Sequence, residues 1–264
     1  VKVMMEVLKQ LGATIEYLDE NTVRINSKDL TSYLTPYNLM DKMRASFLVM
    51  GPLLARLHKT QTVMPGGCAI GARPVDLHLK GFAALGAKID EDASVIGAEA
   101  VGGLKGDIVY LDFTSVGATQ NIMMAACQAK GETILENAAK EPEIVDLANF
   151  LNKMGAQVRG AGTSCIRIEG VEKLTGCTHQ IIPDRIEAAT FLVASAINQG
   201  DLIVENIITS HIRPVIAKLR ETGCVIEEFS EKDEIRIIGP KDLKATSIKT
   251  MPYPGFPTDV KAQF

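Results

Sequence analysis

One short segment combines the residue types that could do chemistry. Residues 64–77 hold three glycines within six positions, one cysteine, Cys68, and an arginine five residues later, Arg73. Glycines let a loop bring its backbone N–H groups close to a ligand, and a thiol on an exposed loop beside a cation ionises readily. Pro74, Val75 and Asp76 then indicate a helix start, where anions bind well. Two interpretations remain open from these residues alone: an active-site loop, and a flexible loop with an incidental cysteine.

Other catalytic and metal motifs are absent from the sequence. It has no phosphate-binding Gly-x-x-x-x-Gly-Lys-Ser/Thr loop, no dinucleotide fingerprint, no serine nucleophile elbow and no histidines at metal-ligand spacing. The five cysteines are odd in number and never form Cys-x-x-Cys, which argues against a disulfide framework and a zinc site and favours a reducing cytoplasm. Four of them suit packing positions, namely Cys127, Cys165, Cys177 and Cys224.

The composition is that of an ordinary globular protein. The 264 residues include 28 Lys and Arg against 32 Asp and Glu, and 46% are apolar, which excludes a disordered or low-complexity chain. A net charge of −4 gives no electrostatic footprint for nucleic acid or an anionic membrane. The longest apolar stretch, residues 47–55, is too short to span a bilayer. We therefore expect no nucleic-acid partner and no membrane insertion.

An internal repeat organises the elements that must position the loop. A helix-like run ends in glycine and is followed by a short β-branched run at Gly12, Gly86, Gly155 and Gly223, which are 74, 69 and 68 residues apart. A second pair of similar segments begins at Gly131 and Gly200, again 69 residues apart. Glycine ends a helix well because it adopts positive φ without a Cβ penalty. The repeat predicts units of about 70 residues, too long for a solenoid.

Each unit is predicted to contain two helices and several strands. The runs 121–126 and 190–196 are apolar nearly all round, which favours buried helices. Short strands are predicted at 108–111, 133–135, 166–168, 202–204 and 235–238. This pattern indicates an α/β fold with units grouped around buried helices. The first unit begins in its last helix and a fifth begins at residue 257, so we expect the chain to be a piece of a longer protein.

Several segments resemble one known family. Residues 65–78 are similar to the active-site loop of the UDP-N-acetylglucosamine 1-carboxyvinyltransferases, the enolpyruvyl transferases that begin peptidoglycan synthesis. Further segments resemble that family in its order and at its spacing; they are residues 115–119, 136–146, 183–187 and 256–264. The resemblance covers the whole chain and implies the enolpyruvyl-transferase fold, with inverse α/β barrel-like domains built from two-helix, four-strand units. It places a first domain at 1–182 and part of a second at 183–264.

The resemblance also implies an activity and roles for particular residues. These enzymes transfer enolpyruvyl from phosphoenolpyruvate to the 3′-hydroxyl of UDP-N-acetylglucosamine and release phosphate, without a metal or cofactor. Cys68 matches the proton donor, which is also the thiol that fosfomycin alkylates. Asp259 matches the aspartate beside the sugar hydroxyl, the expected base. Arg73 and Arg44 match active-site arginines, and the nucleotide contacts match Pro74, Val75, Asp76, Leu77, Ser115, Val116 and Gly117.

Several of these residues have structural interpretations as well. Asp259 could cap the following helix, Arg44 could pair with Asp41 on a solvated helix face, and Ser115 with Gly117 could simply begin a helix. His78 is interpreted as structural. Interdomain contacts, or caps and ion pairs, are the expected roles of Asp184, Arg185, Glu187, Glu141 and Glu143.

The chain departs from the family pattern in ways that bear on activity. A Lys-Asn pair that helps to hold phosphoenolpyruvate would precede Val1, further arginines would follow Phe264, and Phe113 stands where some members have lysine. We therefore expect the 264-residue chain itself to be inactive, because enolpyruvyl transfer depends on converging cations. Two alternatives remain: a non-catalytic UDP-sugar-binding paralogue, and a 3-phosphoshikimate 1-carboxyvinyltransferase. The loop of Cys68 and the segment 115–117 argue against the second.

Overall fold

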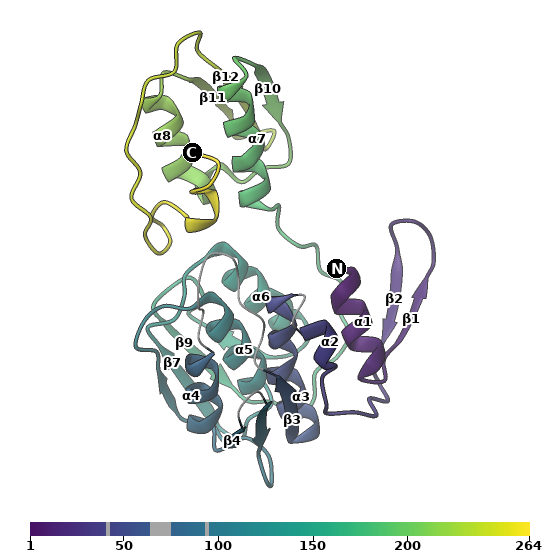
Figure 1. Cartoon of the computed structure of the whole chain (residues 1–264). Helices are drawn as coiled ribbons and strands as arrows, with labels where there is room; N and C mark the ends of the chain where they lie inside the picture. The colour runs from purple at the N-terminus through teal and green to yellow at the C-terminus, as the bar shows by residue number, and fades with distance from the viewer. Residues whose placement is uncertain (41–42, 64–74, 93–94) are drawn as a thin grey trace. The chain divides into compact units, whose positions relative to one another are not determined.

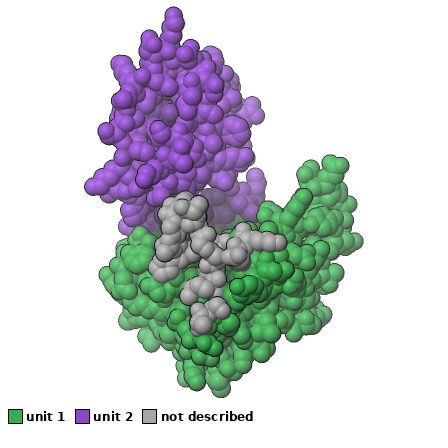
Figure 2. All heavy atoms as spheres, viewed as in Figure 1, with its two compact units in different colours: residues 1–139, 147–179 green, residues 140–146, 180–264 purple. Residues whose placement is uncertain are grey.

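The computed structural model describes residues 1–40, 43–63, 75–92 and 95–264, with only the backbone described at Arg44. Within them the chain divides into two compact units (Figure 2). Unit 1 comprises Val1–Ala139 and Leu147–His179, and unit 2 comprises Lys140–Asp146 and Gln180–Phe264. The domain division expected from the sequence, 1–182 and 183–264, stays a prediction.

The α-helices follow one another along the chain as labelled in Figure 1, and η denotes a short 3-10 helix. They are α1 Lys2–Gln10, α2 Tyr37–Met40, η1 Arg44–Val49, α3 Met50–Leu57, α4 Asp76–Ala84, α5 Val116–Ala126, α6 Pro142–Lys153, α7 Arg185–Ile197, η2 Thr209–Ile212, α8 Arg213–Glu221 and η3 Thr258–Val260. Over the described part of the chain, no helix combines the length and apolarity needed to cross a membrane.

In the described ranges the strands form four small sheets. They are β1 Thr14–Tyr17, β2 Val23–Asn26, β3 Lys59–Val63, β4 Lys88–Asp92, β5 Val95–Glu99, β6 Ile108–Tyr110, β7 Glu132–Glu136, β8 Gln157–Arg159, β9 Cys165–Glu169, β10 Asp201–Val204, β11 Val225–Phe229 and β12 Glu234–Ile238. The sheet orders are β1-β2, β3-β5-β4, β6-β7-β9-β8 and β10-β12-β11. All pairs are antiparallel except β6 with β7. The five strands predicted from the sequence are confirmed.

The predicted repeat is visible at four helix ends. The four glycines follow α1, α4, α6 and α8, and each precedes a strand of a hairpin; their φ values are +105° at Gly12, +88° at Gly86, +102° at Gly155 and +96° at Gly223. Only glycine adopts such angles without strain. The second pair of similar segments also has a backbone counterpart, because Asn137 and Asn206 share φ values of 56° and 54° after β7 and β10. The repeat is therefore one of backbone conformation as well as of sequence.

Helix α5 is the buried centre of unit 1, as its apolar sequence predicts. Ala118, Ile122, Met123 and Ala125 are fully shielded from solvent. Helices α3 and α4 pack against α5. At Gly81 of α4 a Cβ atom would overlap the side chain of Ile122, so a larger residue would force the two helices apart. This close packing fixes where α4 and α5 begin relative to each other.

The corresponding prediction for α7 is only half right. Leu192 and Val193 pack into the core of unit 2 with residues of α8 and β12. Phe191 and Ile197, by contrast, are 55% and 60% exposed. Two helices cover α5, whereas the described part of unit 2 places the single α-helix α8 against α7. An apolar sequence shows which side chains of a helix could be buried. Whether they are buried depends on how many neighbouring elements pack against the helix.

Candidate active site

Helix α4 begins at the first group of predicted nucleotide contacts. Val75 is the residue before the helix, and its carbonyl oxygen accepts hydrogen bonds from the N–H groups of His78 and Leu79 at 2.9 and 3.2 Å. Val75 and Leu77 are each only 3% exposed as whole residues, whereas Asp76 faces solvent. Of the three, Asp76 is the residue whose side chain is open to solvent.

Helix α5 begins at the second group of predicted contacts. Ser115 has an extended backbone, and its hydroxyl oxygen accepts a hydrogen bond from Ala118 N at 3.3 Å. Val116 and Gly117 form the first turn and are half-buried. The interpretation of Ser115 as a helix start is thus confirmed. That role is compatible with ligand binding, because the first N–H groups of a helix have no partner within it and favour anions.

The two helix starts lie side by side in unit 1. A Cβ atom on Gly117 would lie 3.3 Å from Cε1 of His78 in the first turn of α4. One turn further along α5, the Asn121 amide nitrogen is 3.1 Å from Nδ1 of His78. The structure therefore places the first turn of α4, which follows Val75, beside the first turn of α5, which follows Ser115. That these turns contact a nucleotide stays a prediction. Adjacent helix N-termini both carry partial positive charge, which favours the binding of an anion.

Asp259 lies in unit 2, within the short helix η3. The residue that precedes η3 is Pro257, so the alternative of Asp259 as a helix N-cap is wrong. The Asp259 side chain is exposed, and among the described residues no hydrogen bond or ion pair engages its carboxylate. It lines an open pocket of about 400 Å³, together with residues 181–186 and the carboxylates of Glu143 and Asp146. A free carboxylate in a pocket is able to accept a proton from a bound hydroxyl.

Two of the residues that line this pocket form an ion pair. The Arg185 guanidinium donates hydrogen bonds from Nε and Nη2 to the two carboxylate oxygens of Glu143 at 3.2 and 3.0 Å, and its side chain is only 10% exposed. The Arg185 guanidinium also lies 5.8 Å from the centroid of the Tyr253 ring. Asp184 caps α7 by accepting from Ile186 N at 2.8 Å. The ion-pair and cap roles expected for Arg185, Glu143 and Asp184 are confirmed.

The charge of this pair reaches a neighbouring histidine. Burial lowers the pKa of His211 below its ordinary value. The nearby Arg185 lowers the pKa further, and Glu143 acts in the opposite direction. His211 therefore favours its neutral form.

Four predicted site residues fall partly or wholly beyond the described structure. Cys68, Arg73 and Pro74 lie outside the described residues. Arg44 begins η1, and its side chain lies outside the description as well. The roles assigned to these residues stay predictions.

The other four cysteines differ in burial, and Cys165 is only half-buried. Cys127 and Cys224 are buried, as their packing interpretation predicts. Burial raises the pKa of the Cys127 thiol to about 12, which keeps the thiol protonated and unreactive at neutral pH. Cys177 is exposed, so packing does not account for it. Where the structure describes the chain, no three His, Cys, Asp or Glu side chains gather as a metal site would require.

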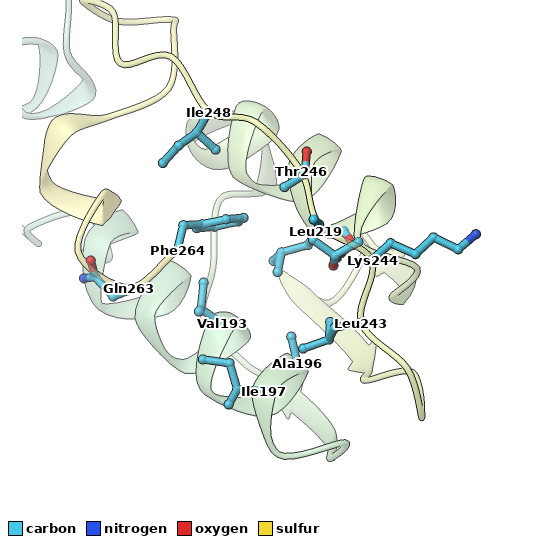
Figure 3. A pocket seen from close by; sticks show the side chains of 12 residues that line it. Val193, Ala196, Ile197, Leu219, Leu243, Lys244, Thr246, Ile248, Gln263 and Phe264 are labelled. Atoms are coloured by element: carbon cyan, nitrogen blue, oxygen red, sulfur yellow. Dashed lines mark hydrogen bonds between the residues drawn. The ribbon is translucent and has the colours of Figure 1, made fainter.

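A second pocket in unit 2 has a different character. It has a volume of about 300 Å³ and is lined by α7, α8, residues 243–248 and the last two residues (Figure 3). The side chains of Val193, Ile197, Leu219 and Phe264 make most of its surface apolar. It contains no predicted site residue.

Sequence reasoning missed one polar feature beside the site. Asn121 is fully buried, and its side chain hydrogen-bonds to three separate segments. The available signal was a single amide within the otherwise apolar run 121–126. His78, interpreted as structural, is one of its partners.

Comparison with known proteins gives matches along the whole chain. A family model described as EPSP synthase (3-phosphoshikimate 1-carboxyvinyltransferase) matches residues 1–264. The UDP-N-acetylglucosamine 1-carboxyvinyltransferase of Finegoldia magna is 66% identical over 264 residues, which are 100% of this chain and 62% of that protein. UDP-N-acetylglucosamine 1-carboxyvinyltransferase 2 of Carboxydothermus hydrogenoformans is 58% identical over 98% of this chain and 62% of its own length. The chain thus spans 62% of the length of these relatives.

Solved structures show the same fold. The enolpyruvyl transferase NikO from Streptomyces tendae superposes with a TM-score of 0.83 at 18% identity, covering 99% of this chain and 62% of that one. The EPSP synthase of Acinetobacter baumannii gives a TM-score of 0.65 at 22% identity, covering 95% and 58%. The fold class expected from the sequence is confirmed.

Proposed function

Because this chain belongs to the EPSP synthase (3-phosphoshikimate 1-carboxyvinyltransferase) family, we propose that it is part of an enzyme that transfers enolpyruvyl from phosphoenolpyruvate to the 3′-hydroxyl of UDP-N-acetylglucosamine. One observation carries the choice of sugar nucleotide: the 66% identity, along all 264 residues, to a protein named for that substrate. The reaction would begin peptidoglycan synthesis in the cytoplasm and so serve cell-wall growth and division.

The two helix starts of unit 1 support the nucleotide half of this proposal. The backbone N–H groups at Val75–Leu77 and Ser115–Gly117 would hold the diphosphate, and the exposed Asp76 is free to contact the uridine. The partial positive charge of the two helix N-termini would favour the diphosphate.

Three further side chains would carry the chemistry. Asp259 would take the proton from the sugar 3′-hydroxyl while the hydroxyl oxygen attacks C2 of phosphoenolpyruvate. Cys68 would give a proton to C3 of phosphoenolpyruvate. Loss of a proton from C3 and of phosphate from C2 then yields the enol ether. Arg44 and Arg73 would neutralise the phosphate and carboxylate charges in place of a metal or organic cofactor. The Asp259 carboxylate is exposed and has no partner among the residues that the structure describes, which supports its role as the base.

Ligand binding and thiol labelling test the proposal on this chain. Calorimetry should show that UDP-N-acetylglucosamine binds and that shikimate 3-phosphate does not. With the sugar nucleotide present, fosfomycin should add one mass increment to the peptide that contains Cys68, and a Cys68→Ser variant is the control. We expect no phosphate release from this chain with both substrates, and measurable release would contradict that expectation.

Each rival function has its own outcome in the same assays. Binding of shikimate 3-phosphate in place of the sugar nucleotide would identify a 3-phosphoshikimate 1-carboxyvinyltransferase. Binding of the sugar nucleotide without a fosfomycin adduct would identify a non-catalytic UDP-sugar-binding paralogue. Failure to bind either ligand would reject the proposed nucleotide site.

A further inference from the structure

A buried polar joint connects the segments around the predicted nucleotide site. Its centre is the side chain of Asn121, which is fully buried in α5. Gly51 N of α3 donates to Asn121 Oδ1 at 2.7 Å, and Asn121 Nδ2 donates to the carbonyl oxygen of Phe47 in η1 at 3.1 Å. The same Nδ2 lies 3.1 Å from Nδ1 of His78 in α4. One amide thus ties α5 to three other segments of unit 1.

The chemistry of these contacts fixes the orientation of the amide. A backbone N–H can only donate, so the atom that faces Gly51 N must be the Asn121 oxygen. The amide NH₂ then faces the Phe47 carbonyl and the His78 ring, and its two hydrogens meet two acceptors. Because an NH₂ group cannot accept, His78 Nδ1 must accept. The ring proton therefore resides on Nε2.

The His78 ring fills the space between the two helix starts. The Phe47 ring packs against it edge-on, with centroids 5.0 Å apart and an interplanar angle of 86°. On its other side, Cε1 and Nε2 of His78 would lie 3.3 and 3.4 Å from a Cβ atom on Gly117. The ring is 94% shielded from solvent, at 6% exposure. His78 is therefore a spacer of fixed orientation between the first turns of α4 and α5.

We propose that His78 and Asn121 are positioning residues for the nucleotide, and that they set the spacing between the first turn of α4 and the first turn of α5. This inference rests on the proposed function, because those turns carry the predicted diphosphate contacts. Neither residue is assigned a contact with the substrate. Asn121 holds the His78 ring through Nδ1. The ring lies so close beside Gly117 that an added Cβ there would come within 3.3 Å of Cε1, so its position limits how near the first turn of α5 can approach α4.

The proposal predicts that loosening the joint weakens binding without unfolding the chain. His78→Leu replaces the imidazole with an apolar side chain of similar volume. It therefore fills the space but removes the acceptor to which Asn121 donates. If one backbone N–H moves out of reach of the anion, a hydrogen bond to a charged group is lost, and the Kd for UDP-N-acetylglucosamine should rise about tenfold or more. His78→Asn should recover most of the affinity, because the Asn oxygen can take the place of Nδ1.

The experiment compares these variants with a matched control. In Asn152→Leu an asparagine in unit 1 loses hydrogen bonds to the N–H and C=O of Val158, at 2.7 and 2.8 Å, far along the chain from the joint. Calorimetry measures the Kd of each variant for UDP-N-acetylglucosamine, and far-UV circular dichroism checks the fold. Nitrogen-15 NMR of the His78 ring at pH 7.5 should show a proton on Nε2. The control should bind like the wild type.

Each contrary result is distinct. If the wild type binds the nucleotide and His78→Leu binds equally well, the positioning role is wrong and the proposed function stands. Equal weakening in Asn152→Leu, or no recovery in His78→Asn, would mean a loss of general stability in place of positioning. A ring proton on Nδ1 would overturn the geometry of the joint itself. A wild type that does not bind the nucleotide removes the proposed function, and the inference with it.

Discussion

Replacing a repeat glycine with alanine should destabilise unit 1 through backbone strain alone. Gly86 and Gly155 end α4 and α6 with φ values of +88° and +102°, and a Cβ atom at either position would meet no atom within 4 Å. An added methyl group therefore finds open space and disturbs no packing. Any loss of stability in Gly86→Ala or Gly155→Ala must come from forcing an L-residue to a positive φ.

The size of this loss follows from the backbone angle. An L-residue with positive φ brings its Cβ close to the following carbonyl oxygen, which costs about 1–2 kcal/mol. For a unit of this size, each kcal/mol lowers the melting temperature by about 2–4 °C. Each variant should therefore melt about 2–8 °C below the wild type. Gly155→Asn should lose less, because asparagine tolerates positive φ better than alanine does.

Gly176→Ala is the matched control. Gly176 also lies in unit 1 and also has open space at its Cβ position, but its φ lies outside the strained positive range. The substitution should leave stability unchanged or raise it by about 0.4–1 kcal/mol, since alanine restricts the unfolded chain. Thermal and urea unfolding followed by far-UV circular dichroism measure all four variants. If Gly176→Ala lost as much stability as Gly155→Ala, the cost would not come from φ and the reasoning would fail.

Three further predictions concern charges and thiols. A double-mutant cycle of Glu143→Gln with Arg185→Met should give a coupling of about 1.5–3 kcal/mol in urea unfolding, because the Arg185 side chain is only 10% exposed; an exposed pair gives about 0.2–1. Folding lowers the pKa of His211 below 6.5, so the unfolded chain binds more protons there, and stability should fall as the pH drops through 6.5; His211→Gln should flatten that part of the pH profile. Iodoacetamide at pH 8 should label the exposed Cys177 and spare Cys127, whose pKa burial raises to about 12, as peptide mass spectrometry would show.

The fold was most predictable where one residue type dictates the backbone. The glycines that end α4 and α6 were recognisable because their spacing recurs and only glycine suits that conformation. The strands were predictable from β-branched runs such as residues 166–168, whose Ile166 and Ile168 side chains are fully buried in β9. The exposure of Phe191 and Ile197 on α7 was not predictable. It depends on neighbouring elements that the local sequence does not specify.

The candidate site was predictable only in part for a related reason. The helix starts at Val75 and Ser115 have local signals, namely a proline before one and a hydroxyl cap at the other. The partners of Asn121 have no local signal in the sequence, since His78 and Phe47 lie 43 and 74 residues away along the chain. Composition shows that a buried amide needs partners, and only the folded chain shows which ones it has.

The long span of those hydrogen bonds also bears on the order in which unit 1 folds. The strand pair β8–β9 closes a short hairpin, whereas the bond from Gly51 to Asn121 joins residues 70 apart. Closing a long loop costs more chain entropy than closing a hairpin, so local pairs are expected to form early and distant contacts late. The contacts around Asn121 would then be among the last to form in unit 1. A bound nucleotide, which depends on those late contacts, would therefore slow unfolding more than it speeds folding.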